Sequence, residues 1–401
     1  MFLKVISQGS GNIAKVFIQI CLIICMKKEE NPSKKIILPL VYYKIFIFLF
    51  ILISIVLLPI FSNKDFNWAV HFPQERGPVF ADYFRSWDSQ HYLYIAEKGY
   101  LPPGSSTNAF YPLWPFFIKI FSYLLLQNYL ITALLLSAVF SIFGIYLFHY
   151  LVTKHFSLNL ADKSTLLLLA YPGSLFFLFP YSESLFFLLS VLFFWFFFEK
   201  KTLGLAVISF LLPITRPVGF LFLIPLLYNV CKSPKSFKNY LLLLAPILGL
   251  LAYLSIMYFS TGSSLEGFNA QASYFPQGAS VAKAVDFSGF LNSLFSVSSV
   301  HSYFGSAIDR LFFLAFLILL PFVWKLKKVY FLFSLFMGLI PAMANSLVSY
   351  TRYLAMVFPI FIAAAWLLEK RDKKWFWLAV ISLFSLQLIL LIRHVNNFWV
   401  G

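Results

Sequence analysis

The residues best suited to chemistry are a few ionisable side chains that interrupt long apolar runs. They are Asp82, Asp88, His91, Glu183, Arg216 and Arg352. Charged side chains in or beside a hydrocarbon layer are costly, so such residues are functional candidates. A carboxylate can accept a proton as a general base, and an arginine at a break between apolar segments needs an anion, either a carboxylate or a ligand phosphate. These residue types indicate a polar site within an apolar protein.

Each candidate also has a structural interpretation. Asp88 and His91 are three residues apart and share one face of a predicted helix. That helix could be an aromatic element at the membrane surface, with Asp88 as its cap. Glu183 could likewise cap a helix, and Arg352 could extend its side chain to the membrane surface. Other ionisable residues are interpreted as structural or follow no pattern: His155, Glu266, Asp286, His301 and Asp309.

The composition defines the class of protein that must position these residues. Of the 401 residues, 61% are hydrophobic and only 11% are charged, whereas a soluble domain carries about 25% charged residues. A soluble enzyme, a secreted disulfide domain and a disordered chain are therefore excluded. The three cysteines follow no metal-binding or disulfide pattern, and neither a metal nor a cofactor is expected.

The apolar runs predict an all-α polytopic membrane protein with eleven crossings or half-crossings. The segment 113–126 is interpreted as an interfacial element that does not cross. The segments 203–213 and 218–230 are too short to span, and they predict a helical hairpin that is broken where Arg216 lies. The expected crossings are 45–61, 129–151, 164–179, 181–198, 203–213, 218–230, 240–260, 310–324, 329–346, 350–368 and 375–393.

The basic residues predict the orientation of these crossings. Lys and Arg gather in every second loop, and such loops face the cytoplasm in membrane proteins. This places the N-terminus inside and the polar loops 62–112 and 261–309 outside. It also accounts for the net charge of +16, so no nucleic-acid partner is expected.

The chain is interpreted as one transmembrane domain over 45–401, preceded by a cytoplasmic segment over 1–44. Met26 is followed by a run of charged residues, as is common at the start of a protein. We therefore hypothesise that Met26 is the initiator and that 1–25 precede the true start. The alternative is a short amphipathic segment lying on the membrane.

Several motifs occur in order over about 85–360. The longest is Arg-Ser-Trp-Asp-Ser-Gln-His-Tyr-Leu at 85–93, followed by Ile-Ala-Glu-Lys-Gly-Tyr at 95–100 and Ala-Phe-Tyr-Pro-Leu-Trp-Pro at 109–115. This stretch resembles the first luminal loop of the PIG-V family, which comprises GPI mannosyltransferase 2 and its prokaryotic relatives. Shorter motifs at 171–174 with 181–186, at 215–219 and at 352–353 with 358–359 are also similar to that family.

The resemblance implies a GT-C glycosyltransferase, here expected to be a prokaryotic relative. It would transfer a hexose, with mannose expected, from a polyprenyl- or dolichyl-phosphate sugar to a lipid-linked or cell-surface glycan by a single inverting displacement. The reaction would take place on the extracytoplasmic face of the plasma membrane, or in the lumen of the endoplasmic reticulum in a eukaryote. A small membrane partner subunit is a further expectation.

The resemblance also implies roles for the candidates. Asp88 would be the general base, with Asp82 in reserve. Arg216, Arg352 and His91 would bind the donor phosphate, with His91 alternatively orienting Asp88. The remaining substrate-binding candidates are Glu183, Trp87, Tyr181 and Asp82.

Other classes remain open at the level of sequence. A transporter or lipid flippase would also use a broken helix, although no internal repeat is visible. A membrane acyltransferase or protease would have only Ser174 and His91 to work with, in the wrong motif. A noncatalytic subunit of a glycan-assembly complex would keep the fold and tolerate the loss of Asp88.

Overall fold

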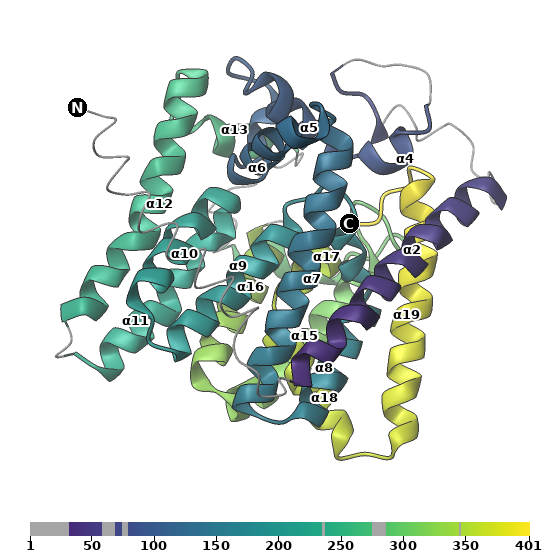
Figure 1. Cartoon of the computed structure of the whole chain (residues 1–401), viewed down its shortest axis with the longest axis vertical. Helices are drawn as coiled ribbons and strands as arrows, with labels where there is room; N and C mark the ends of the chain where they lie inside the picture. The colour runs from purple at the N-terminus through teal and green to yellow at the C-terminus, as the bar shows by residue number, and fades with distance from the viewer. Residues whose placement is uncertain (1–31, 58–68, 74–78, 235–236, 275–285, 345) are drawn as a thin grey trace.

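The computed structural model describes residues 32–57, 69–73, 79–234, 237–274, 286–344 and 346–401. Every regular element within these ranges is a helix (Figure 1). The all-α prediction is therefore confirmed. The hypothesis about Met26 concerns residues outside the described ranges.

Among the residues that the structure describes, five helices are long and apolar enough to cross a membrane. They expose large apolar side chains along their length, including Val56, Phe259 and Ile318. Such outward-facing apolar surface is expected where lipid surrounds the protein. The five helices are α2 (Ile37–Leu57), α7 (Tyr129–His155), α12 (Phe237–Thr261), α15 (Ala307–Leu326) and α19 (Lys373–Val395).

The other apolar helices are shorter. At about 1.5 Å per residue none reaches across ~30 Å of hydrocarbon, so several of them end inside the protein. Five long helices do not establish eleven crossings, and that number stays a prediction. The shorter helices are α6 (Leu113–Ser122), α8 (Leu158–Ala170), α9 (Glu183–Phe198), α10 (Thr202–Thr215), α11 (Leu223–Lys232), α16 (Lys328–Ala344) and α18 (Pro359–Glu369).

Two segments predicted as single crossings are broken instead. The expected helix 164–179 stops at Ala170 and continues as the 3-10 helix η5 (Pro172–Phe177). The expected helix 350–368 is divided into α17 (Tyr350–Leu354) and α18. Proline provides no N–H group and disfavours helical backbone in the residue before it. Pro172 explains the first break, and Pro359 begins α18 in the second.

The break predicted at Arg216 is present. Its backbone is extended (φ −157°, ψ 151°) between α10 and the 3-10 helix η6 (Pro217–Phe222). The end of α8 shows how such breaks are stabilised. The Gln387 side chain of α19 donates to the carbonyls of Leu169 and Tyr171 at 2.9 and 2.8 Å. Backbone groups left free by the break are thus satisfied within the protein.

Aromatic side chains pack between three of the short helices, α9, α16 and α18. The Phe194 ring of α9 lies 5.0 Å from that of Phe333 in α16 and 5.4 Å from that of Phe358, at the start of α18. These edge-on ring contacts add to the burial of apolar area. They hold α9, α16 and α18 at fixed distances from one another.

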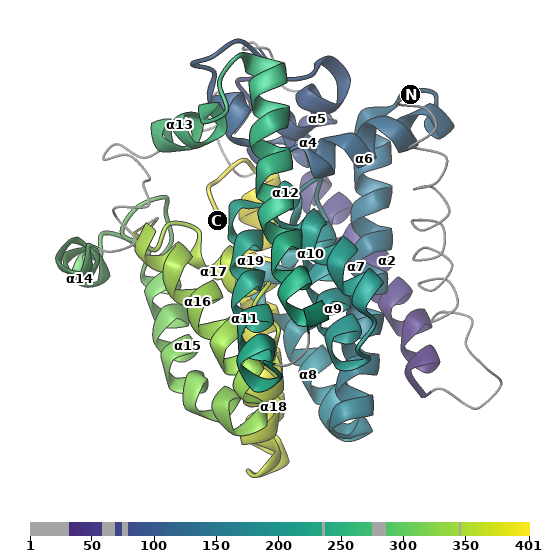
Figure 2. The same ribbon diagram turned by 90° about the vertical axis from the view of Figure 1, so that its left-hand side faces the viewer.

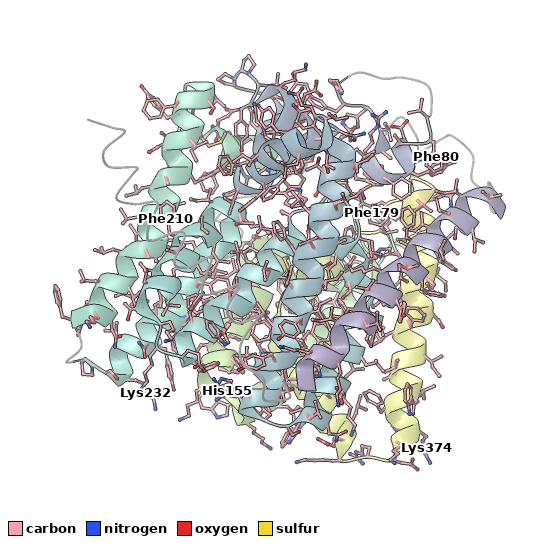
Figure 3. All side chains as sticks on the ribbon, viewed as in Figure 1. Phe80, His155, Phe179, Phe210, Lys232 and Lys374 are labelled. Carbon is pink, nitrogen blue, oxygen red and sulfur yellow. The ribbon has the colours of Figure 1, made fainter. Side chains whose placement is uncertain are left out.

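Most elements of the loops that are predicted to lie outside gather at one end of the molecule (Figures 1 and 2). The elements there are α4 (Asp82–Arg85), α5 (Asp88–Lys98), η3 (Ser106–Ala109), α6 and α13 (Glu266–Ser273). Glu266 connects the two loops, because its carboxylate accepts from Gly104 N at 2.7 Å and Asn108 Nδ2 at 3.1 Å. Lys232, His155 and Lys374 lie at the opposite end (Figure 3).

Candidate active site

Four ionisable side chains from distant parts of the chain meet in one cluster. Arg352 lies at its centre. Its Nη1 is 2.6 Å from Oδ2 of Asp88, and its Nε donates to Oε1 of Glu183. Nη1 of Arg216 is 2.6 Å from the same Glu183 oxygen. Two cations and two anions therefore balance in one connected network, which we call the ion cluster.

Burial is unequal across the ion cluster. The side chain of Glu183 is fully buried and those of Arg216 and Arg352 are 8% and 6% exposed, whereas that of Asp88 is 24% exposed. Buried charges persist in proteins only when they are paired and hydrogen-bonded. Asp88 is thus the accessible end of an otherwise closed network.

The local fold places three of the four charges at the end of an element, whereas Arg352 lies within the short helix α17. Asp88 and Glu183 are the first residues of α5 and α9, where the helix dipole favours a carboxylate. Arg216 follows the last residue of α10, where the dipole favours a cation. The broken helices therefore bring the charges together at electrostatically suitable positions.

Aromatic rings hold the two guanidinium groups. The guanidinium carbon of Arg352 lies 4.7 Å from the centre of the Tyr181 ring and 4.9 Å from that of Phe176. That of Arg216 lies 5.3 Å from the centre of the Tyr353 ring. Such cation–π contacts are worth more where water is excluded. Tyr181 thus contacts Arg352, and the buried position of Arg352 removes the alternative that it reaches for the membrane surface.

Trp87 fixes the start of α5. Its φ of 57° and ψ of −129° are unusual for a bulky side chain. Its N–H donates to the Ala69 carbonyl at 2.8 Å, and its ring contacts that of Trp399. Backbone strain of this kind persists where the surrounding structure enforces it, and it often occurs at functional sites. Here it orients the adjacent Asp88.

His91 contacts other residues than those of the ion cluster. Its Nδ1 is 3.0 Å from Oγ1 of Thr107 and its Nε2 is 3.4 Å from the hydroxyl of Tyr274. Its ring stacks on that of Phe110 with centroids 4.8 Å apart. Burial lowers the pKa of His91 to about 3, so the ring is neutral at pH 7 and would meet a ligand as a neutral group.

Asp82 binds within its own turn. It accepts from Nε of Arg85 at 2.7 Å and from Val79 N at 2.9 Å. These bonds hold α4, just before the strained Trp87. In the structure Asp82 therefore stabilises the segment that leads to Asp88.

Asp309 is a site residue that the sequence did not reveal. It is fully buried at the start of α15, and its Oδ1 accepts from both the N–H and the hydroxyl of Thr351 at 2.7 Å. The Tyr171 hydroxyl donates to the Thr351 carbonyl at 2.9 Å, and a Cβ on Gly173 would lie 2.3 Å from that carbonyl oxygen. Thr351 is thus held on both sides, which fixes the adjacent Arg352.

Asp309 is not a member of the ion cluster, but replacing it with Ala should disturb the cluster through Thr351, the neighbour of Arg352. The Thr351 N–H and hydroxyl would lose their buried acceptor, at a cost of about 1–3 kcal/mol each. We expect a lower melting temperature in thermal denaturation. Thr351→Val is the matched control, since it keeps the N–H bond and should have a smaller effect. A melting temperature equal to that of the unaltered protein would contradict this role.

The cluster can bind an anion and accept a proton at one place. A phosphate oxygen matches the forked donors of Arg352, and Asp88 is exposed beside it. Among the described residues no three His, Cys, Asp or Glu side chains are grouped to hold a metal ion. The chemistry that these side chains offer is therefore anion binding combined with general-base catalysis.

Fold and site together define an integral membrane protein whose helices break around a buried arginine–carboxylate cluster. The family model described as Mannosyltransferase (PIG-V) matches residues 33–214, which include Asp88 and Glu183. This part of the chain is thus similar to the PIG-V mannosyltransferase family, as the motifs predict, and the similarity supports glycosyltransferase activity with a sugar donor and an acceptor. No curated protein matches the chain. Arg216 and Arg352 lie beyond the matched residues and join the site through the fold.

Proposed function

We propose that the protein transfers mannose from a polyprenyl- or dolichyl-phosphate mannose to a glycan or glycolipid at the outer face of the membrane. The observation that carries this proposal is Arg352, which contacts the exposed Asp88 and the buried Glu183 at once. A phosphate-linked donor requires a cation at its leaving group, and the acceptor hydroxyl requires a base nearby. The ion cluster offers both groups, because the cation Arg352 and the carboxylate of Asp88 contact each other directly.

The reaction is a single displacement. The acceptor oxygen forms a bond to the anomeric carbon while the bond from that carbon to the phosphate oxygen breaks. The acceptor proton passes to Asp88, and polyprenyl phosphate leaves with the electron pair. Arg352 and Arg216 stabilise the charge that develops on the phosphate, because a guanidinium stays protonated and matches its oxygens. The configuration of the sugar is inverted.

The pairing of Asp88 with Arg352 also suggests an order of events. Without substrate, the guanidinium holds the carboxylate at 2.6 Å. A donor phosphate would compete for the same N–H groups and would release the Asp88 carboxylate from Arg352. Donor binding would in this way prepare the base before the acceptor reacts.

Glu183 is proposed to hold the two arginines and to contact the sugar. One of its oxygens accepts from both guanidinium groups. The other is buried and has no hydrogen-bond partner among the described residues, so a sugar hydroxyl would donate to it once donor binding has opened the ion cluster. Trp87, His91 and Asp82 are proposed to form the outer-loop wall around the substrates, and Tyr181 to act through Arg352.

The activity can be tested with the purified protein in lipid nanodiscs. Polyprenyl-phosphate [¹⁴C]mannose is supplied together with a lipid extract as the source of acceptor, and label is followed into products that are not the donor. The expected result is labelled product that depends on time and enzyme. A parallel assay measures movement of the donor across liposomes. Movement without transfer would overturn the proposal in favour of a flippase.

The outer location of the site is part of the proposal. This is supported by the position of Lys232 and Lys374. They lie at one end of the molecule, opposite the end that carries α5, which begins with Asp88 (Figures 1 and 3). Basic loops remain on the cytoplasmic side. The ion cluster would then lie toward the outer side.

Cysteine labelling tests this orientation. Cys21 and Cys25 are first replaced by serine, which leaves the exposed Cys231 near the basic end. We expect Cys231 to react with a membrane-impermeant maleimide only after the vesicles are permeabilised. In the same background with Cys231→Ser, a Pro103→Cys change in the exposed outer loop should react in intact right-side-out vesicles. Labelling of Cys231 in intact vesicles would reverse the orientation.

A further inference from the structure

Two side chains of α5 reach toward the ion cluster from one face of the helix. Asp88 contacts Arg352 at 2.6 Å. One turn later, the hydroxyl of Tyr92 lies 2.9 Å from Oγ of Ser182, and that oxygen accepts from Nη1 of Arg216 at 3.1 Å. Residues four apart lie on the same side of a helix. The helix α5 is thus joined to both arginines, to one directly and to the other through Ser182.

The hydrogen bond between Tyr92 and Ser182, which we call the tyrosine link, is closed to water. Tyr92 is 5% exposed and Ser182 is fully buried. Burial raises the pKa of Tyr92, so its hydroxyl keeps its proton at pH 7. The Tyr92 ring packs edge-on against that of Phe110, with centroids 4.9 Å apart. Ring packing and hydrogen bond therefore hold this side chain together.

Ser182 also directs the guanidinium group of Arg216. Nη1 of Arg216 contacts Oε1 of Glu183 at 2.6 Å as well as Oγ of Ser182. A guanidinium nitrogen of this kind carries two N–H groups, so both of them have an acceptor here. Ser182 directly precedes Glu183 at the start of α9. The tyrosine link thus connects α5 to the point where α9 begins.

The other polar side chains near the start of α5 bind elsewhere. Gln90 and His91 contact residues of the predicted outer loops. Within the part of the chain that the structure describes, Asp88 and Tyr92 are thus the α5 side chains in polar contact with the ion cluster or with Ser182. When a donor phosphate takes the place of Asp88, the tyrosine link still ties α5 to the cluster.

We infer that Tyr92 and Ser182 are positioning residues, which hold Asp88 in place to accept the proton after the donor phosphate has released it from Arg352. This inference rests on the proposed function and adds two residues that act through Asp88. The two α5 residues belong to one helical turn, so a fixed Tyr92 limits the movement of Asp88. Misplacing a catalytic group by about 1 Å can cost roughly 10²-fold in rate.

Kinetics of the transfer reaction test the tyrosine link. Tyr92→Phe removes the hydroxyl and keeps the ring, so kcat should fall about tenfold, whereas the donor KM should stay unchanged because Ser182 still holds Arg216. Ser182→Ala removes both contacts and should lower kcat and raise the donor KM. Tyr94→Phe is the matched control, because it makes the same change at a partly exposed residue of α5. It should leave both constants unchanged.

The dependence on Asp88 separates positioning from general damage to the protein. In an Asp88→Asn background, Tyr92→Phe should cause no further loss of kcat, because no base is left to position. General damage would lower the activity by the same factor in both backgrounds, and such a result would contradict the positioning role.

Hydrogen exchange of the α5 amides tests the two contacts without any transfer. Asp88→Ala and Tyr92→Phe each leave one contact in place, so each variant should exchange almost as slowly as the unaltered protein. The double variant should exchange about tenfold faster than the two single effects combined predict, as for loss of a buried hydrogen bond. If transfer is never observed but this synergy is, the tyrosine link stands and the proposed reaction fails. Purely additive exchange, or an unchanged kcat in Tyr92→Phe, would overturn the inference.

Discussion

Replacing Asp88 with Asn will lower the rate of mannose transfer by roughly 10² or more while the protein stays folded. The amide keeps the size of the side chain and an oxygen that can accept from Arg352, but it cannot take the acceptor proton. Asp88 is also the most exposed member of the ion cluster, so its change disturbs the buried part least. The donor KM should not rise, because the amide competes less than the carboxylate for Arg352, and the melting temperature should remain near that of the unaltered protein. Transfer and thermal stability are measured on the same preparation.

Asp82→Asn is the matched control for this experiment. Asp82 is an outer-loop carboxylate of the same type that binds Arg85 and the backbone of Val79, and its change should reduce transfer far less. If Asp88 only stabilised the start of α5, its replacement would instead cost about 1 kcal/mol of stability and leave the activity per folded molecule intact. A fully active Asp88→Asn protein would reject the catalytic assignment and favour a noncatalytic subunit.

Replacing Glu183 with Gln should have the largest effect on stability. The change removes the anion that two buried arginines share. Breaking a buried ion pair by removal of one partner costs roughly 3–5 kcal/mol, because the remaining charge is buried without compensation. We expect a large fall in melting temperature and loss of transfer. Thermal denaturation in detergent, with and without donor, measures both the loss and any rescue by the phosphate.

Glu199→Gln provides the control for the Glu183 variant. Glu199 forms an ion pair with Lys154 at 2.5 Å on the surface, where its side chain is 26% exposed. Surface pairs contribute about 0–1 kcal/mol, so this variant should melt almost normally. Equal melting temperatures for the Glu183 and Glu199 variants would show that the ion cluster adds no special stability.

The sequence alone predicts the class of the protein and several of its local features. Apolar runs with few charges leave only membrane helices as a stable outcome, because backbone groups in lipid must be satisfied within a helix. The break at Arg216 is predictable because Pro213, Pro217 and Gly219 surround it and the flanking runs are too short to span. The first-loop motif that contains Asp88 indicates the family by itself, and the family match agrees with it.

Other helix breaks were less visible in the sequence. Pro172 and Pro359 lie inside the expected crossings 164–179 and 350–368, and the structure breaks the helix at both places. A proline within a membrane helix can be tolerated when neighbours satisfy the freed groups. Whether the helix continues is therefore decided by partners such as Gln387, which come from a distant helix.

Only the tertiary structure decides how the site is assembled. The role of Asp309 depends on its contact with Thr351, which lies far away along the chain. Arg352 is likewise shared between two carboxylates only because the fold brings Asp88 and Glu183 into contact with it. Local sequence determines where helices can begin and break, because those propensities act over a few residues. Ion pairing and ring contacts act through space, so they are determined only when the packing of the helices is known.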